Sequence, residues 1–249
     1  MPRYSRKALC GNFFHVIVQG LNKEYIFYEN YYKERYKRLL IKESKSNNIK
    51  IIAYCIMNNH AHILMFVNNT EDMSKCMHKI NTSYARFYNK EKERVGFVFR
   101  DRFYTQPIKN EIHLLKCIAY IHKNPIKAGL VNKESNYKYS SYNEYMNLSE
   151  SQLISNESIE LVFNTSDKFK FKEMFNFIHN INLEEDDVLE IEEDIDYNQI
   201  IEKYKSENIS IDNMVIRLYK LHKLSTRDIA NLLDITRYKV RKILGNSEK

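Results

Sequence analysis

The 249-residue sequence has no long apolar run and no paired cysteines. No apolar stretch approaches the roughly 20 residues that a membrane-spanning helix needs. The first ten residues are basic, but no secretory apolar core follows them, so we expect a cytoplasmic protein with no membrane partner. The four cysteines are scattered and form no C-x-x-C motif, which argues against a zinc knuckle or a disulfide framework. A chain of this length can hold one large domain or two smaller ones.

Acidic residues are scarce in the first part of the chain. Residues 1–149 contain 25 Lys and Arg against 12 Asp and Glu, a net charge of +13, whereas residues 150–249 have a net charge of −6. A basic region of this kind is typical of proteins that bind a polyanion, most simply nucleic acid. Residues 184–196 contain nine acids and no base. We expect this run to be a solvated linker, and the alternative is a mimic of DNA charge that restrains the basic region.

The hydrophobic pattern of the first part predicts both strands and helices. The predicted strands are residues 12–20, 49–57, 60–67 and 96–108, and the predicted helices are residues 30–48, 70–94 and 111–125. The first six elements follow the order β-α-β-β-α-β, the split β-α-β pattern of ferredoxin-like folds, with the last helix appended. We therefore expect an α+β fold. This fold alone does not indicate a reaction, because it serves many functions.

After about residue 150 the pattern is helical, and we place the domain boundary there, with domains at 1–149 and 150–249. Residues 225–244 have the spacing of a helix-turn-helix, with Asp234 in the turn, where a left-handed conformation is tolerated. The second helix would offer five side chains to a DNA groove: Arg237, Tyr238, Lys239, Arg241 and Lys242. A simple three-helix packing unit is the alternative.

Two histidines interrupt the otherwise apolar stretch YCIMNNHAHILMF, residues 54–66. Because strand side chains alternate between faces, His60 and His62 point to the same side. Two imidazoles on one face of a rigid strand are either a metal clamp or a costly part of the core. The other histidines that we considered are expected to be structural or to face DNA: His15, His78, His113 and His122.

Tyr120 and Asn124 lie four residues apart in a predicted helix and therefore share one face. Two imidazoles and one amide oxygen would hold a divalent cation loosely and leave positions open for a phosphate. A tyrosine beside that cation can attack the phosphate. Tyr84 and Tyr88 are rival nucleophiles by composition, and a half-buried structural tyrosine is the alternative for Tyr120.

Between about residues 13 and 145, more than half of the chain, six segments resemble, in the same order, motifs of the single-tyrosine HUH (histidine–hydrophobe–histidine) transposases, and most closely the REP-associated tyrosine transposases. They are FFHVIVQGLNKEYIF, YCIMNNHAHIL, INTSYARFYN, GFVFRDRFYTQPI, YIHKNPIKAGLV and YKYSSYNEY. The resemblance implies an HUH domain with an appended catalytic helix. It also implies that Tyr120 is the nucleophile and that His60, His62 and Asn124 hold the metal.

The resemblance further implies a reaction on single-stranded or hairpin DNA. In the family, the tyrosine attacks a phosphodiester in the presence of Mg²⁺ or Mn²⁺, giving a 5′-phosphotyrosine and a free 3′-hydroxyl. The hydroxyl of another strand reverses the step and joins strands without ATP. Arg100 and Arg102, on one face of the predicted strand 96–108, are expected DNA contacts. The C-terminal domain offers a surface for duplex DNA, and we expect a monomer or a homodimer.

Two other functions stay open from the sequence. A non-catalytic, sequence-specific DNA-binding regulator would share the fold, but a degenerate copy should lose His60, His62 or Tyr120, and all three are present. A hydrolytic metal-dependent nuclease would want acidic metal ligands, and the histidine strand offers none. We therefore favour a DNA strand-transfer enzyme.

Overall fold

The computed structural model describes residues 11–147, 151–165, 167–180, 197–220 and 226–246. It divides into two compact units. One is formed by the described residues up to 180 apart from 128–130, and the other by residues 128–130 and the described residues from 197 onwards. Each unit is described by itself. The acidic run 184–196 lies outside the described residues. No helix in the described part of the chain is both long enough and apolar enough to cross a membrane.

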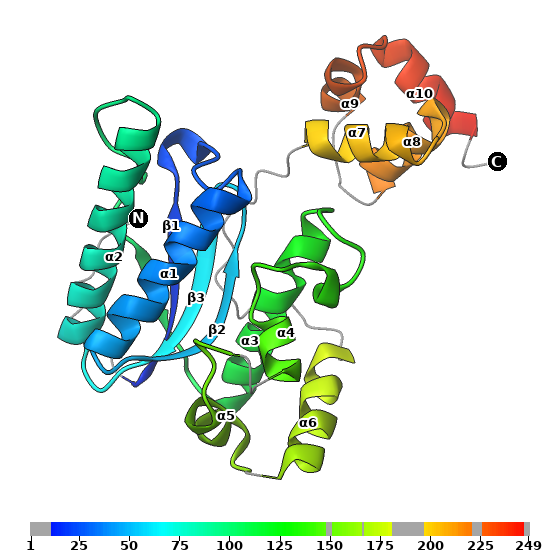
Figure 1. Ribbon diagram of the computed structural model, residues 1–249. Helices are drawn as coiled ribbons and strands as arrows, with labels where there is room; N and C mark the ends of the chain where they lie inside the picture. Colours follow the sequence, from blue (N-terminus) through cyan, green and yellow to red (C-terminus); the bar gives the residue numbers. More distant parts are fainter. Residues whose placement is uncertain (1–10, 148–150, 166, 181–196, 221–225, 247–249) are drawn as a thin grey trace. The chain divides into compact units, whose positions relative to one another are not determined.

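The first unit is built on a four-stranded antiparallel sheet with the order β2-β3-β1-β4 (Figure 1). The strands are β1 (Phe13–Gln19), β2 (Lys50–Ile56), β3 (His60–Phe66) and β4 (Tyr104–Pro107). Helix α1 (Asn30–Ser46) connects β1 to β2, and helix α2 (Thr70–Glu91) follows β3. The element order is the one that the sequence pattern predicts for the first part of the chain.

The fourth strand is shorter than the sequence predicts, because its register to β1 changes. Tyr104 lies opposite Ile17, but Phe99 forms an isolated bridge with Gly20. The segment between these two pairings has more residues than the facing part of β1, so it leaves the ladder instead of continuing it. Arg100 and Arg102 consequently lie in the loop before β4, and the prediction that they share one face of a strand is wrong.

The two faces of the sheet differ in chemistry. Helices α1 and α2 cover one face, and helix α3 (Glu111–Lys127) packs on the other (Figure 1). Beneath α1 and α2 lies an aromatic core in which the ring of Phe27 is 4.8 Å from that of Tyr36 and 5.0 Å from that of Tyr84. Alternation along β3 places Ala61 and Ile63 on this apolar face, so the histidines of β3 point toward α3.

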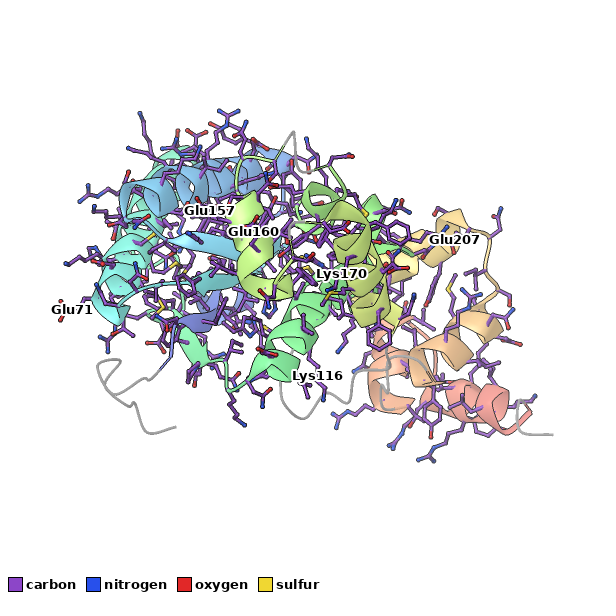
Figure 2. All side chains as sticks on the ribbon, turned by 90° about the horizontal axis from the view of Figure 1, so that it is seen from below. Glu71, Lys116, Glu157, Glu160, Lys170 and Glu207 are labelled. Atoms are coloured by element: carbon purple, nitrogen blue, oxygen red, sulfur yellow. The ribbon has the colours of Figure 1, made fainter. Side chains whose placement is uncertain are left out.

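The first unit extends beyond the domain boundary that the sequence suggested at residue 149. Helices α5 (Asn156–Phe163) and α6 (Lys168–Asn180) pack against β2 and α3, with α4 (Tyr142–Met146) preceding them. Both helices expose charged side chains, among them the three labelled in Figure 2: Glu157, Glu160 and Lys170. The composition change at 149 therefore marks the end of the basic segment and not the end of the folded unit.

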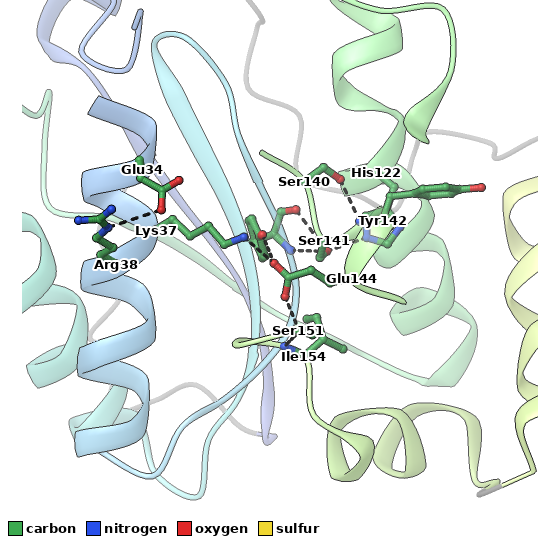
Figure 3. Close-up of polar contacts among 11 residues, drawn as sticks. Glu34, Lys37, Arg38, His122, Ser140, Ser141, Tyr142, Glu144, Ser151 and Ile154 are labelled. Atoms are coloured by element: carbon green, nitrogen blue, oxygen red, sulfur yellow. Dashed lines mark hydrogen bonds and ion pairs between the residues drawn. The ribbon is translucent and has the colours of Figure 1, made fainter. Parts of the chain in front are cut away.

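A chain of hydrogen bonds joins α6 and α3 to the edge of the sheet. His179 Nδ1 donates to Phe175 O (2.8 Å), so its Nε2 accepts from His122 Nδ1 (2.9 Å). His122 Nε2 then accepts from the hydroxyl of Ser141 (2.7 Å), which in turn accepts from Tyr54 N (2.9 Å; Figure 3). Both imidazoles are neutral in this arrangement, and burial lowers the pKa of each.

A carboxylate in the same region fixes α4 to the sheet and to α1 (Figure 3). Glu144 accepts hydrogen bonds from Tyr54 and Ser151, and its Oε1 lies 2.8 Å from Lys37 Nζ. Burial raises the pKa of Glu144, but the hydrogen bonds from Lys37, Ser151 and Tyr54 outweigh it and lower that pKa. The charge of Glu144 is therefore compensated within the fold.

The second unit is a small helical bundle. It comprises α7 (Tyr197–Ser206), α8 (Ile211–Lys220), α9 (Thr226–Leu232) and α10 (Arg237–Asn246). Ile229 of α9 and Val240 of α10 are fully buried in its hydrophobic core. Asp234, between α9 and α10, has a left-handed φ of 51°, as the sequence predicts for the turn.

The buried His122–His179 pair should make the stability of the first unit depend on pH. His179 in the unfolded chain takes up a proton near pH 6.5, whereas burial lowers its pKa in the fold, so that the folded chain takes up this proton at a lower pH. The unfolded state therefore binds more protons, and the free energy of unfolding falls as the pH decreases from 7 to 5. His179→Gln should reduce this fall by up to ~1.4 kcal/mol per pH unit.

Urea unfolding at several pH values between 7 and 5 measures this dependence. His78→Gln is the matched control, because His78 is exposed on α2. If His179→Gln and the wild type lose stability with pH at the same rate, His179 is not held neutral in the fold.

Candidate active site

The site lies on the face of the sheet that α3 covers. In the antiparallel register of β1 and β3, His62 lies opposite Ile17 and His60 lies opposite Gln19, so these four side chains share one face. The Asn58–Asn59 turn between β2 and β3 positions the first histidine. His60 Nδ1 donates to Asn59 Oδ1 at 2.6 Å, which leaves Nε2 as the unprotonated nitrogen of His60.

A third imidazole supports the pair from β1. His15 Nε2 and His62 Nδ1 form a hydrogen bond of 3.0 Å, and both side chains are buried. Burial lowers the pKa of His15 to about 3, with a further contribution from His113. The pKa of His62 is well below its usual range, mainly because the side chain is buried, and His60, His15 and Lys127 lower it further. Both imidazoles are therefore neutral at pH 7, and when His62 Nδ1 donates to His15 Nε2, the lone pair of His62 Nε2 is left for a metal or a proton donor.

Helix α3 brings the predicted tyrosine to these histidines. The ring centroid of Tyr120 lies 5.6 Å from that of His62 and 6.2 Å from that of His15. Asn124, one helical turn further on, is fully buried, and its Nδ2 donates to Tyr120 O at 3.2 Å. The structure thus places the ring of Tyr120 beside that of His62, which lies 4.9 Å from that of His60, and Asn124 follows one turn further along α3.

The rival tyrosines lie on the opposite face of the sheet. Tyr84 is buried in the aromatic core and donates to Ile26 O at 2.5 Å. Burial raises the pKa of Tyr84 well above its usual value, and burial together with Glu24 raises the pKa of Tyr88 to about 12. Neither environment favours a nucleophile, and neither ring contacts a histidine of the site in the described residues.

Sequence reasoning missed two residues of the site, His15 and Lys127. The expectation that His15 is merely structural or DNA-facing overlooked its bond to His62. Lys127 Nζ lies 4.8 Å from the ring centroid of Tyr120. Lys127 follows Tyr120 by seven residues, or about two helical turns, so the sequence spacing could have predicted that both lie on one face of the helix.

The donor atoms of the site fit a divalent cation held by a small set of ligands. His62 Nε2 and Asn124 Oδ1 are buried, and neither has a hydrogen-bond partner within the described part of the chain. No group of three His, Cys, Asp or Glu side chains in the described ranges is placed to hold a metal. A cation here would therefore rely on two imidazoles and an amide oxygen, leaving further positions to water or a phosphate.

The predicted DNA-binding residues occupy two separate places. Arg100 and Arg102 are exposed in the loop before β4, and Arg100 Nη1 donates to Gln19 Oε1 at 3.2 Å. The other five lie on the exposed side of α10 in the second unit: Arg237, Tyr238, Lys239, Arg241 and Lys242.

Comparison with known proteins agrees with this geometry. Residues 11–124 match the family described as IS200-like transposases. A curated relative from Haemophilus influenzae, named "Putative REP-associated tyrosine transposase", is 26% identical over 155 residues, which cover 57% of this chain and 86% of the relative. A solved structure of a REP-associated tyrosine transposase bound to a REP hairpin has a TM-score of 0.51 and 19% identity, covering 61% of this chain and 88% of that one.

These comparisons indicate what the first part of the chain is similar to. Residues 11–124 are similar to the IS200-like transposases. More specifically, the expected resemblance to the single-tyrosine HUH transposases, and among them to REP-associated tyrosine transposases, is confirmed.

Metal binding should depend on the histidine face of β3. His62→Ala removes a buried imidazole whose Nε2 has no other partner in the described residues, so we expect Mn²⁺ affinity to fall by at least about tenfold. His15→Phe should lower it by about tenfold, because His62 loses the hydrogen bond that orients its ring. Isothermal titration of full-length protein with Mn²⁺ measures both effects. His78→Ala, on the exposed side of α2, is the control, and equal affinity for all variants would contradict the site.

Proposed function

We propose that this protein cleaves and rejoins single-stranded DNA through a covalent 5′-phosphotyrosine at Tyr120, with a divalent cation, Mg²⁺ or Mn²⁺, held by His60, His62 and Asn124. The observation that carries the proposal is the position of Tyr120, whose ring packs 5.6 Å from that of His62 on the histidine face of a transposase-like sheet.

The proposed reaction begins with attack of the Tyr120 hydroxyl oxygen on a backbone phosphorus. The new O–P bond forms as the bond from phosphorus to the 3′-oxygen breaks. The Tyr120 hydroxyl gives up its proton to solvent and the 3′-oxygen takes one up from solvent, so that it leaves as a hydroxyl and no net proton is gained or lost. A bound divalent cation supplies Lewis-acid polarisation of the phosphate oxygens. The 3′-hydroxyl of another strand can then attack the phosphotyrosine, which joins the strands and restores Tyr120 without ATP.

The remaining residues of the site prepare the tyrosine for this attack. A phenol is weakly nucleophilic because its usual pKa is about 10. The ammonium of Lys127, 4.8 Å from the ring centroid, favours the negative charge that develops on the phenol oxygen as it attacks. The neutral His15–His62 pair keeps a second positive charge out of the buried site and leaves the His62 lone pair for the cation.

The proposed substrate is DNA with a hairpin next to an unpaired strand. The structural relative was solved with a REP hairpin, and residues 1–149 of this chain carry a net charge of +13. The α10 surface is the proposed contact for duplex DNA, since its exposed basic side chains suit phosphates and base edges. A non-catalytic regulator is less well supported, because a degenerate copy should lose His60, His62 or Tyr120, and this chain keeps all three.

Tyr120→Phe should abolish the covalent adduct and leave DNA affinity nearly unchanged. The substitution removes only the hydroxyl and keeps the ring that packs against His62. The experiment incubates full-length protein with a hairpin oligonucleotide and Mn²⁺ and detects the adduct on a denaturing gel. Tyr84→Phe is the matched control, and it should keep cleavage although it loses its bond to Ile26 O. An adduct that persists in Tyr120→Phe would refute the assignment.

The second unit should affect duplex binding and not the chemistry. Replacing Arg241 and Lys242 together by Ala should reduce the salt slope of duplex binding by about 2, if each contacts one phosphate. Adduct formation on a single-stranded hairpin should stay at the wild-type level. The control replaces two exposed lysines of α6, Lys170 and Lys172. An unchanged slope in the α10 variant would make the second unit a structural appendage.

A further inference from the structure

The loop between α2 and β4 exposes the two most solvent-accessible large apolar side chains of the described residues. Val95 is 94% exposed and Phe97 is 81% exposed. Between them, Gly96 has a φ of 107°, a conformation that other residues rarely adopt. This turn separates the two apolar side chains by a single residue at the end of the loop. We call residues 95–97 the apolar tip.

The apolar tip is held in place by hydrogen bonds and an ion pair. Arg94 Nη1 contacts both carboxylate oxygens of Glu24, at 2.6 and 2.7 Å, while its Nη2 donates to Phe97 O at 3.1 Å. Asn89 Nδ2 donates to Gly96 O at 2.9 Å. The backbone at Gly96 and Phe97 is therefore held by hydrogen bonds in a position that leaves the Phe97 side chain exposed. Binding to a loop that is already ordered costs less conformational entropy than binding to a loop that must first become ordered.

The braced loop runs beside the end of the sheet that carries His60. Leu21 N donates to Val98 O at 2.9 Å, and Arg100 N donates to Gln19 O at 2.9 Å. Gln19 is the register partner of His60, and the next residue, Gly20, donates to Asn59 O at 2.8 Å. The loop therefore lies next to the end of β1 that pairs with His60 of the candidate active site.

The surroundings of the apolar tip select a negatively charged ligand with flat apolar faces. Residues 86–102 contain six Lys and Arg against three Asp and Glu, and Arg100 and Arg102 are exposed just after the tip. An unpaired nucleotide combines both properties, since its phosphate suits the arginines and its base suits an exposed aromatic ring. A folded duplex hides its base faces and offers only phosphates to such a tip.

We propose that Phe97, supported by Val95, is a stacking site for an unpaired base of the DNA strand that flanks the cleaved phosphodiester. This inference rests on the proposed function and names a substrate contact for it. The arginines of the loop would hold the adjoining phosphates, and the stacked base would fix which phosphodiester reaches Tyr120.

The test uses full-length Tyr120→Phe protein, so that binding is measured without cleavage, and two probes. One probe is a DNA hairpin with a single-stranded flank that carries 2-aminopurine at one position at a time. The other is the same hairpin with a blunt end. Phe97→Ala in this background should weaken binding of the flanked hairpin about tenfold and leave the blunt hairpin and the salt slope unchanged. Phe97→Trp should restore affinity, and quenching of 2-aminopurine at one flank position should disappear only in Phe97→Ala.

Phe169→Ala is the matched control, because Phe169 is 71% exposed on α6, away from the loop. Unchanged affinity of Phe97→Ala for the flanked hairpin would overturn the inference, as would equal weakening with both probes. The inference would also be overturned if Phe97→Ala lost binding to anionic phospholipid vesicles while its DNA affinity stayed unchanged. Formation of the covalent adduct is measured separately with the wild-type protein. If the adduct forms but the stacking test fails, only the stacking site is rejected. A positive stacking test without an adduct rejects only the chemistry.

Discussion

The packing of α3 across the histidine face of the sheet is the contact on which the candidate site depends. That face would be an ordinary core surface if α3 presented apolar side chains alone. Instead α3 sets the Tyr120 ring against His62 and His15, and it buries Asn124 one turn further on. Enclosure by the helix removes water from the imidazoles, which lowers the pKa of His62 and His15 and keeps both neutral. The same helix thus supplies the proposed nucleophile and maintains the histidine chemistry that it needs.

The position of α3 is fixed in turn by the chain that follows it. Ser141 and Tyr139 extend the edge of β2 through hydrogen bonds to Tyr54 and Ile56, and Ser141 also donates to His122 on α3. Helix α6 completes this support through His179. Residues 151–180 are therefore part of the unit that carries the proposed chemistry, although their sequence reads as a separate helical region.

Much of this arrangement could be predicted from the sequence, because it depends on local periodicity. Alternation in β3 was enough to place His60 and His62 on one face, and four-residue spacing was enough to place Tyr120 and Asn124 together. The hydrogen bond between His15 and His62 depends on the register between two strands far apart in sequence, which no local pattern specifies. For the same reason the early end of β4, and with it the position of Arg100, could not be read from the alternating residues 96–108. Composition could not show where α5 and α6 pack, because it says nothing of contacts between distant segments.

The central claim is that the hydroxyl of Tyr120 becomes covalently attached to DNA. Its most direct measurement is mass spectrometry of the proteolysed adduct formed between full-length wild-type protein and a hairpin oligonucleotide with Mn²⁺. The account predicts one modified peptide, from α3, with a nucleotide attached to Tyr120 through its 5′-phosphate. A nucleotide on Tyr84, Tyr88 or any other residue, or cleaved DNA with no attached peptide, would contradict it.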